Sequence, residues 1–244
     1  MLLMPSALIL GASGDIGQAV AREMAGNGWS LYLHYHAHVA IADQLAAELS
    51  AKYPKQDFFT VAGDLRDVNS AQTIANQLFS LDAVIVAAGM TYYELFKDAT
   101  IDHMTALMRV HLLTPMALIN HVQDKLAASG NGRIVFIGSV YGASGSAMEV
   151  TYSTVKGAQS AFVKAYAQEV ASLGITVNVV APGAVDTKMN REFGASALEA
   201  VRETIPAGRF ANATDIAYFV NTLVNQRAGY FTGQTLYVTG GWLR

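Results

Sequence analysis

The glycine-rich segment GASGDIG, at residues 11–17, restricts the fold of this chain more than any other stretch. It follows a short apolar run at residues 7–10 and leads into a helical pattern that extends to Asn27. Glycines at positions 11, 14 and 17 permit a tight turn and a close approach of backbone to a ligand, and amides at a helix N-terminus face anionic charge. A plain strand-to-helix turn has a similar composition, so the surrounding pattern decides between the two interpretations.

Strand-like and helix-like segments alternate along the whole chain. Strands are expected at residues 7–10, 31–35, 58–62, 83–87, 134–137, 176–180 and 235–238, and helices up to residue 27 and at 40–52, 70–78, 101–126, 152–172 and 214–225. This alternation predicts an α/β protein with a doubly wound parallel sheet (a Rossmann fold) and ligands at the carboxyl ends of the strands. In that fold the glycine-rich segment binds the pyrophosphate of a dinucleotide, through Gly11, Ser13, Gly14, Asp15, Ile16 and Gly17.

The chain reads as one domain over residues 1–244, because no Pro/Gly/Ser-rich linker or run of charges divides it. Residues 189–210 have poor periodicity, and we expect them to form a substrate lid. With 52% hydrophobic and 14% charged residues, the chain has enough apolar material to cover both faces of a sheet.

The charge and cysteine content exclude several classes of function. A net charge of −3 with scattered basic residues argues against a nucleic-acid-binding surface. The absence of cysteine excludes disulfides and thiolate chemistry, and it is compatible with a reducing cytoplasm. The N-terminus has no basic region typical of a signal peptide, and no apolar run approaches the ~20 residues of a membrane helix. We therefore expect a cytoplasmic protein with no membrane partner.

The end of the second expected strand bears on the choice of cofactor. An acidic residue there would hold a ribose 2′-hydroxyl and indicate NAD, but the sequence is His34-Tyr35-His36. A 2′-phosphate is not repelled, so the pattern favours NADPH over NADH, with His34 at the cofactor, although no arginine clamp is visible. The histidines at 34, 36 and 38 lack paired carboxylates and helical spacing, so we predict a surface loop and no metal site.

Tyr152 and Lys156 are the strongest candidates for chemistry, with Ser139 thirteen residues before the tyrosine. If Tyr152 opens a helix, the i,i+4 spacing places both side chains on one face. An ammonium beside a phenol favours the phenolate and brings its pKa closer to neutrality, where acid–base catalysis is efficient. A serine at the end of the preceding strand then binds the same substrate oxygen. The three residues predict a site for carbonyl reduction.

A second pair with the same spacing, Tyr93 and Lys97, serves as an internal comparison. It has no strand-end serine at the matching distance, and we interpret it as a solvated helix start.

Other strand ends add candidate cofactor contacts. The third strand ends at Gly63-Asp64-Leu65, where the Asp64 carboxylate can accept from an adenine amine. The fourth runs into Ala88-Gly89, a small-residue corner where backbone can lie against a ribose.

Over essentially its whole length, the chain resembles the short-chain dehydrogenase/reductases. The matching residues are Gly11 and Gly17, Asp64, Ala88-Gly89, Ser139, Tyr152-x-x-x-Lys156, Asn178, Pro182-Gly183 with Thr187, and the terminal GQTLYVTGGW. The resemblance implies that Tyr152 donates a proton to the nascent alkoxide and that Ser139 orients the carbonyl. It also implies that Lys156 lowers the tyrosine pKa and binds the nicotinamide ribose. The nicotinamide end is then held by Pro182, Gly183, Val185 and Thr187, and the adenine end by Asp64 and Leu65.

Three positions depart from the family pattern. Asp15 stands where the family has a middle glycine, and a carboxylate there repels phosphates unless it points away or caps the helix. Val86-Ala87 replaces the Asn-Asn that usually precedes Ala-Gly. His111 occupies the place of the helix asparagine in the family's proton relay, and we expect its imidazole to substitute.

Two substrate classes remain open. The overall pattern, down to GITVNVVAPG, is similar to 3-oxoacyl-[acyl-carrier-protein] reductases, but Gly130 and Leu173 stand where those enzymes carry basic residues for an acidic carrier. Other segments are similar to reductases of the 5-aminopentanone group on elongation factor P. These segments are SLYLHYH, AAGMTYYELF, the stretch from Glu149 through TYSTVKGAQSAFVKA and the C-terminal Gly-Gly-Trp. Glu149 either attracts a substrate ammonium or is an ordinary solvated acid.

Two functions of other classes use the same fold. A non-catalytic dinucleotide-binding redox sensor has no need of Ser139, Tyr152 and Lys156, so their presence favours an enzyme. A structural partner protein would require an unusually apolar lid and surface. The family resemblance further implies a homotetramer or homodimer, formed through the long helices and the C-terminal strand.

Overall fold

The computed structural model describes residues 4–191 and 194–242 of the chain. It contains a parallel seven-stranded sheet with the strand order β3-β2-β1-β4-β5-β6-β7. The strands are β1 Ser6–Leu10, β2 Ser30–Tyr35, β3 Phe58–Ala62, β4 Ala83–Val86, β5 Arg133–Ile137, β6 Thr176–Pro182 and β7 Thr235–Val238. The order reverses between β1 and β4, which is where a doubly wound sheet binds its ligand.

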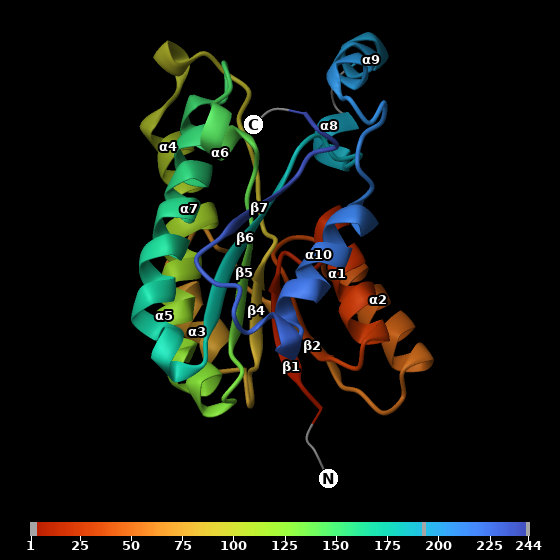
Figure 1. Cartoon of the computed structure of the whole chain (residues 1–244), viewed down its shortest axis with the longest axis vertical. Helices are drawn as coiled ribbons and strands as arrows, with labels where there is room; N and C mark the ends of the chain where they lie inside the picture. The colour runs from red at the N-terminus through yellow and green to blue at the C-terminus, as the bar shows by residue number, and fades with distance from the viewer. Residues whose placement is uncertain (1–3, 192–193, 243–244) are drawn as a thin grey trace.

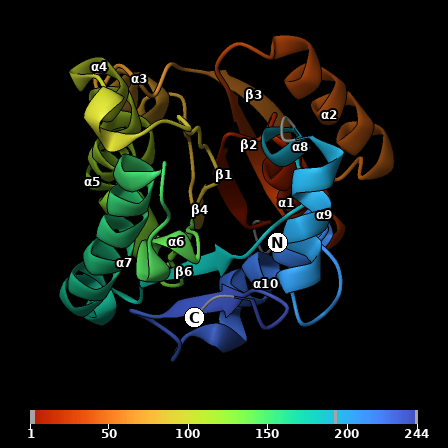
Figure 2. The ribbon, with the colours of Figure 1, turned by 90° about the horizontal axis from the view of Figure 1, so that it is seen from above.

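Helices cover both faces of this sheet. Helices α1, α2 and α10 lie on one face, and α3, α4, α5 and α7 lie on the other (Figures 1 and 2). Their bounds are α1 Asp15–Gly26, α2 Val39–Lys52, α3 Ser70–Ala75, α4 Ile101–Met108, α5 Thr114–Ala128, α6 Tyr141–Ser144, α7 Val150–Val170, α8 Lys188–Arg191, α9 Ala195–Thr204 and α10 Ala213–Val224. The predicted fold class is therefore confirmed.

The central strands are buried on both sides. In β1, Leu8 and Leu10 pack into the core beneath α3 and α5, whereas Ala7 and Ile9 pack into the core beneath α1 and α10. Successive side chains of a strand point to opposite faces, so an uninterrupted apolar run serves two cores at once. This burial fixes the β1 carboxyl end, from which the glycine-rich loop starts.

The predicted helix at residues 101–126 is wrong in one respect, because it is not continuous. A π turn, Arg109–Leu113, separates α4 from α5. Pro115 follows this turn and has no N–H to donate to the carbonyl four residues earlier, which belongs to His111. A proline in the first turn of α5 is tolerated, but the regular helical hydrogen bond to His111 is not available.

Smaller corrections concern segment ends. The helix expected at residues 70–78 ends at Ala75, and the helix expected to begin at Tyr152 begins at Val150. The segment at residues 189–210 has poor periodicity in sequence but contains the last residues of α8 and all of α9. Positions 192 and 193 of that predicted lid lie outside the described residues.

The described residues contain neither a membrane-spanning helix nor a cluster of metal ligands. No helix in residues 4–191 and 194–242 is long and apolar enough to cross a membrane. Within the same ranges, no three histidine, cysteine, aspartate or glutamate side chains gather as metal ligands.

Candidate active site

The structure brings Ser139, Tyr152 and Lys156 together at the carboxyl end of β5. Tyr152 and Lys156 lie on one face of α7, with the Lys156 Nζ atom 5.4 Å from the centroid of the phenol ring. Ser139 follows β5 and its hydroxyl is hydrogen-bonded to the Tyr152 phenol. Lys156 donates from Nζ to the main-chain carbonyl of Ile137 at 2.7 Å, which anchors α7 to the strand that delivers the serine.

Burial dominates the protonation of these groups. Desolvation, followed by the negative charge of Glu149, raises the pKa of Tyr152, and the hydrogen bond with Ser139 lowers it by less. Burial also lowers the pKa of Lys156 to about 7. The predicted net lowering of the phenol pKa is therefore wrong for this arrangement of residues, because desolvation outweighs the contributions that favour the phenolate. At neutral pH the phenol keeps its proton, which is the form that a proton donor needs.

The comparison pair, Tyr93 and Lys97, has no such geometry. Tyr93 lies outside any helix or strand and Lys97 lies in the short 3₁₀ turn Phe96–Asp98, and both are exposed. The expectation of a helix start is thus wrong, and the i,i+4 spacing does not place the two side chains on one helix face.

His111 lies in the π turn and is fully buried beside Tyr152. Its ring meets the Tyr152 ring edge-on at a centroid distance of 5.5 Å. Its Nε2 atom lies 2.8 Å from the Met90 carbonyl and 3.2 Å from the Met90 N–H. Burial, and then the charge of Lys156, lowers the pKa of His111 to about 3, so the imidazole is neutral. The other nitrogen, Nδ1, is buried without a partner.

The His111 carbonyl receives its hydrogen bond from another helix. The Nε2 atom of Gln159, on α7, donates to it at 2.7 Å. Gln159 and Lys156 are three residues apart and therefore lie on the same face of α7. Gln159 replaces the donor that Pro115 lacks, and so it ties the catalytic helix to the π turn. Sequence reasoning missed Gln159. The only signal in the sequence was an amide side chain on the buried face of one helix, together with a proline that interrupts another helix.

The glycine-rich loop has the shape of a cradle for a pyrophosphate. Gly11 has a φ of +79°, and a Cβ atom there would lie 2.5 Å from Ala88 Cα. A Cβ atom on Gly17 would lie 2.1 Å from the Gly11 carbonyl oxygen. The N-terminus of α1 carries no side-chain cap at Gly14, which leaves the amides of its first turn for an anion. The residues present therefore fit a dinucleotide, which on binding would supply the redox equivalents for the reaction.

His34 lies beneath this loop, not on its surface. The side chain is 2% exposed, and its Nδ1 atom accepts the Gly11 N–H at 3.0 Å. The Nε2 atom lies 3.2 Å from the Gly63 carbonyl. Burial lowers the pKa of His34 to about 4, so a neutral ring links the loop to the end of β3. The expectation of a direct cofactor contact is therefore corrected to a supporting position.

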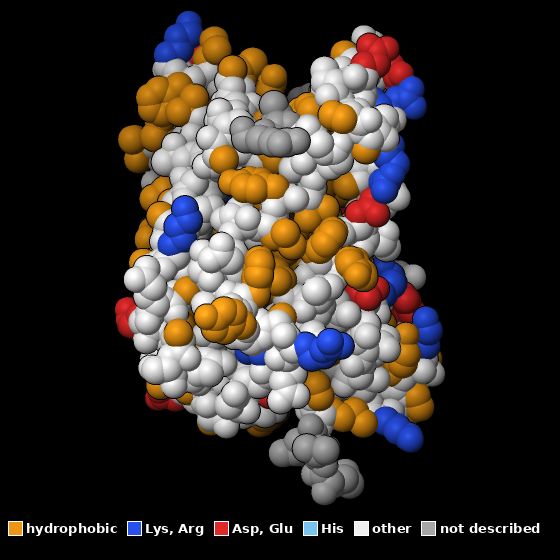
Figure 3. All heavy atoms as spheres, in the orientation of Figure 1, with side chains coloured by type: hydrophobic (Ala, Val, Ile, Leu, Met, Phe, Trp, Pro, Cys, Tyr) orange, Lys and Arg blue, Asp and Glu red, His pale blue; other side chains and the backbone are white. Residues whose placement is uncertain are grey.

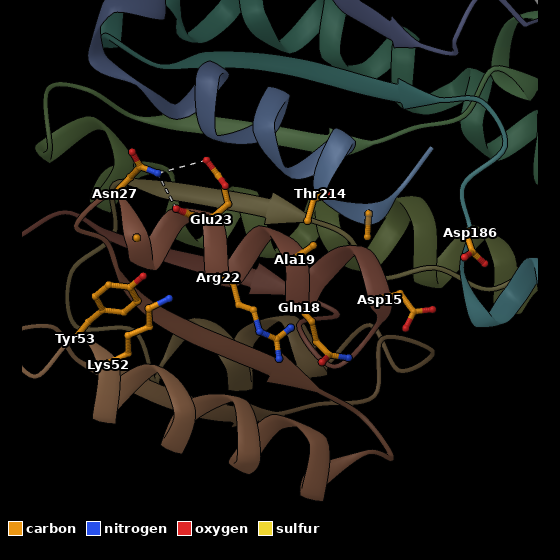
Figure 4. Close-up of a pocket in the computed structure, with 12 residues that line it drawn as sticks. Asp15, Gln18, Ala19, Arg22, Glu23, Asn27, Lys52, Tyr53, Asp186 and Thr214 are labelled. Atoms are coloured by element: carbon orange, nitrogen blue, oxygen red, sulfur yellow. Dashed lines mark hydrogen bonds between the residues drawn. The ribbon is translucent and has the colours of Figure 1, made fainter. Parts of the chain in front are cut away.

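Asp15 points toward the lid base. Its Oδ2 atom accepts the main-chain N–H of Lys188, at the start of α8, at 2.6 Å. The carboxylate is thus engaged by the segment that follows Thr187. Figure 4 shows Asp15 at the start of α1 and Asp186 across from it.

These two residues mark one end of a surface groove of about 570 Å³ along α1, the start of α10 and the end of α2 (Figure 4). The groove does not contain Ser139, Tyr152 or Lys156. We therefore place the candidate site by its chemistry and not by the size of this hollow.

The other predicted cofactor residues lie at or beside strand ends on the carboxyl edge of the sheet. Leu65 is buried and its carbonyl accepts the Thr114 hydroxyl at 2.8 Å. A Cβ atom on Gly89 would lie 3.1 Å from the His111 ring, so this corner packs against His111. The remaining members of the set are Ala88, which follows β4, Pro182, which is the last residue of β6, and Gly183, Val185 and Thr187, which follow β6.

The carboxylate of Glu149 lies close enough to Tyr152 and Tyr141 for its charge to act on both phenols. Its Oε1 atom accepts the Thr91 hydroxyl at 2.9 Å, and its charge raises the pKa values of both Tyr152 and Tyr141. Met148, directly before it, has a φ of +62°, a conformation that costs free energy in a residue with a side chain. An acid is therefore held at the edge of the site by a strained turn.

Arg66 is a second residue that sequence reasoning missed. It follows Asp64 by two positions and donates hydrogen bonds to that carboxylate from two nitrogens, Nε and Nη2. Charged groups two residues apart after a strand give little signal in sequence, because their pairing depends on the turn.

Comparison with known proteins agrees with this geometry. The family model described as enoyl-(acyl carrier protein) reductase matches residues 11–243. The chain is 38% identical over 242 residues to the oxidoreductase YmfI of Bacillus subtilis (strain 168), covering 97% of this chain and 98% of that protein. It is 32% identical over 238 residues to the 3-oxoacyl-[acyl-carrier-protein] reductase FabG of Escherichia coli (strain K12), covering 96% of each.

A solved structure shares the fold over nearly the whole chain. The blue fluorescent protein from a metagenomic library, in complex with NADPH, superposes with a TM-score of 0.90 at 27% identity and 98% coverage of both chains. The match of sequence and fold extends from the glycine-rich loop to the last strand. The chain therefore belongs to the short-chain dehydrogenase/reductase family of oxidoreductases.

Proposed function

We propose that this protein is an NADPH-dependent reductase that converts a ketone to a secondary alcohol, with Tyr152 as the proton donor. The observation that carries the proposal is the cluster of Ser139, Tyr152 and Lys156 at the carboxyl end of β5, in which Lys156 is buried and the other two residues are partly buried. Such an intact acid–base set is not needed by a non-catalytic redox sensor.

In this proposal Ser139, Tyr152 and Lys156 have separate roles. The Ser139 hydroxyl orients the substrate carbonyl next to the Tyr152 phenol, which is protonated at neutral pH because burial raises its pKa. When the phenol gives up its proton to the substrate oxygen, the protonated Lys156 side chain, on the same helix face, stabilises the resulting phenolate. A nicotinamide cofactor, when bound, would supply the hydride. The glycine-rich loop and the ends of β3, β4 and β6 would hold that cofactor.

The first substrate candidate is a 3-oxoacyl thioester presented on an acyl carrier protein. It is supported by the 32% identity to the E. coli reductase of that name over almost all of both chains. In this proposal the segment of α8 and α9 acts as a lid over the acyl chain. Gly130 and Leu173, both exposed, provide no cation for an acidic carrier, so docking would rely on other surfaces.

The second candidate is an amino-ketone such as the 5-aminopentanone group on elongation factor P. The specific observation in its favour is Glu149, whose carboxylate is held by Thr91 and whose charge acts on the Tyr152 phenol, beside which the substrate carbonyl would bind. An ammonium group several bonds from the ketone would pair with this carboxylate. The neutral end of a 3-oxoacyl chain gains nothing from the same charge.

The deciding experiment measures oxidation of NADPH with purified protein against a panel of 3-oxoacyl thioesters and amino-ketones. For a cationic substrate, Glu149→Gln should raise KM several-fold, because a partly exposed ion pair contributes up to about 1 kcal/mol. Added salt should weaken the wild-type enzyme for that substrate, because the Debye length is ~10 Å at 0.1 M. A neutral ketone is the control and should be unaffected. Improved use of acyl-carrier substrates by Glu149→Gln, with no turnover of amino-ketones, would select the first candidate.

We also propose that the protein acts as a homotetramer or homodimer. On the face that Figure 3 shows, hydrophobic side chains gather near the middle, over β6 and β7. Exposed aromatic side chains lie on β7 and on the segment that precedes it, namely Tyr237 on the strand and Tyr230 and Phe231 before it. Patches of this kind mark association surfaces. Sedimentation velocity should give a species of at least twice the monomer mass, and a monomer would contradict the proposal.

A further inference from the structure

The carboxylate at the start of α7 is held in one position by two hydroxyl groups. The Oε1 atom of Glu149 accepts the Thr91 hydroxyl at 2.9 Å, and its Oε2 atom lies 3.5 Å from the Ser146 hydroxyl oxygen. The main chain adds a further link, because the Glu94 N–H donates to the Met148 carbonyl at 2.9 Å. The segment after β4 and the segment before α7 therefore support this acid together.

The protein supplies no cation to this carboxylate. Within residues 4–191 and 194–242, no lysine, arginine or histidine side chain forms an ion pair with Glu149. Its hydrogen-bond donors are neutral hydroxyls, and its charge raises the pKa values of the Tyr141 and Tyr152 phenols. Glu149 is partly buried, and an acid in that environment gives up hydration that neutral donors restore only in part. A cationic ligand would supply the missing partner.

Two aromatic rings lie beside this acid. Tyr141, the first residue of α6, is hydrogen-bonded through its phenol to Ser146, the serine that approaches Glu149. The Trp242 ring meets the Tyr141 ring at a centroid distance of 6.1 Å and an interplanar angle of 62°. Trp242 is the last described residue, and Figures 1 and 2 show this end of the chain beside α6. Both aromatic residues are partly exposed, so a ligand can reach them.

These groups lie next to the proposed site of reduction. Glu149 precedes Tyr152 by three residues, and side chains with that spacing are neighbours on a helix surface. A Cβ atom on Gly183, directly after β6, would lie 3.3 Å from Cε3 of Trp242, which places the tryptophan at the carboxyl edge of the sheet. A ligand with its carbonyl at Tyr152 would therefore extend along the start of α7 toward Glu149.

We propose that Glu149, Tyr141 and Trp242 form a subsite for an organic ammonium group of the substrate, with Thr91 and Ser146 holding the acid in place. The proposal rests on the proposed ketone reduction and names a substrate class within it, ketones whose chain ends in a protonated amine. A single carboxylate beside aromatic faces suits an alkylammonium group, which is attracted to both. A divalent metal ion takes six or more oxygen ligands, and the described residues gather no such set.

The test measures binding without turnover. Titration calorimetry gives the dissociation constants of pentylammonium and of 1-pentanol, a neutral molecule of the same chain length, with and without NADP⁺. We expect the wild type to prefer pentylammonium about fivefold and Glu149→Gln to remove that preference. Thr91→Val, which keeps the shape of the side chain and loses its hydroxyl, should weaken pentylammonium about twofold. Binding of 1-pentanol should stay unchanged in both variants, which reports that they are folded.

The aromatic rings have their own variants. Tyr141→Leu and Trp242→Leu remove a ring face, and each should weaken pentylammonium about threefold. Tyr141→Phe keeps the ring and loses only the phenol hydroxyl, so it should change the affinity by less than about twofold. An equal loss in Tyr141→Phe and Tyr141→Leu would overturn the aromatic part of the subsite.

Glu169 is the matched control for the acid. It lies on the same helix, and its charge also raises the pKa of a phenol, that of Tyr166, but it is exposed near the other end of α7. Glu169→Gln should leave both dissociation constants unchanged.

Two results separate the subsite from the proposed reduction. Equal affinity of the wild type for pentylammonium and 1-pentanol, or a preference that survives Glu149→Gln, would overturn the subsite, while NADPH-dependent reduction of neutral ketones by the same preparation would still support the reductase. A preference that depends on Glu149, in a protein that reduces no ketone, would support the ammonium subsite and overturn the proposed reduction.

Discussion

Gln159 donates a hydrogen bond to the main-chain carbonyl of His111 at 2.7 Å, in a position where a helix would ordinarily supply an N–H. That N–H is missing because Pro115 stands four residues after His111. The catalytic helix α7 therefore completes the hydrogen bonding of the π turn, and it does so from the face that carries Lys156. Local unwinding at a functional residue is typical of π turns.

Replacing Gln159 by Leu should destabilise the protein by about 1–3 kcal/mol, because the His111 carbonyl is left buried without a donor. The measurement is urea-induced unfolding. Pro115→Ala restores a backbone N–H that can donate to the same carbonyl, so the double variant should recover part of the loss. Simple additivity of the two single changes would show that the two donors do not serve one carbonyl.

Tyr152→Phe should lower kcat by ~10²–10⁴, because the ring still packs and only the positioned acid is removed. The NADPH dissociation constant should stay nearly the same. Tyr93→Phe is the control, since Tyr93 has the same spacing to a lysine but lies outside any helix. Similar rates for the two variants would place the proton donor elsewhere.

Asp15→Ala should loosen the lid base, because the Lys188 N–H loses its acceptor. We expect limited proteolysis within the described part of α9, after Arg202 for trypsin, to become several-fold faster, while Asp15→Asn, which keeps an oxygen acceptor, changes it less. Asp43→Ala, which removes an exposed acid from α2, is the control for charge. If Asn and Ala at position 15 both tighten NADPH binding and leave proteolysis unchanged, the carboxylate acts by repelling phosphate instead.

The stability of the protein should fall as the pH is lowered from 6.5 through about 4, in part because of His34. Burial holds the pKa of His34 at about 4 in the folded chain, below its ordinary value of 6.5, so the unfolded chain binds the extra proton first. The neutral ring therefore contributes stability above pH 6.5 that is lost on acidification, up to about 3 kcal/mol for this shift.

His34→Asn keeps an acceptor for the Gly11 N–H and cannot titrate. Its free energy of unfolding, measured between pH 7 and pH 4, should therefore decline less than that of the wild type. His111, with a pKa of about 3, titrates in both proteins and contributes equally to each curve. Parallel curves for the two proteins would show that His34 is not the titrating group.

The sequence by itself determined the fold class and the core of the candidate site. Apolar runs as in β1 serve two cores, glycines at 11 and 17 admit no side chain, and the spacing of Tyr152 and Lys156 places both on one helix face. These features depend on local periodicity and on steric limits of single residues. Both are determined by residues that are close together in the sequence, so they can be predicted from the sequence alone.

The tertiary structure decided what depends on distant partners. Burial of Tyr152 and Lys156 reverses the expected pKa of the phenol, since desolvation exceeds the effect of a nearby charge. The His34 side chain points inward, where its two ring nitrogens lie within hydrogen-bonding distance of the Gly11 N–H and the Gly63 carbonyl. Gln159 meets His111 across 48 residues, and Asp15 meets Lys188 across 173. Such contacts depend on how complete helices and strands pack, and no pattern within one segment encodes them.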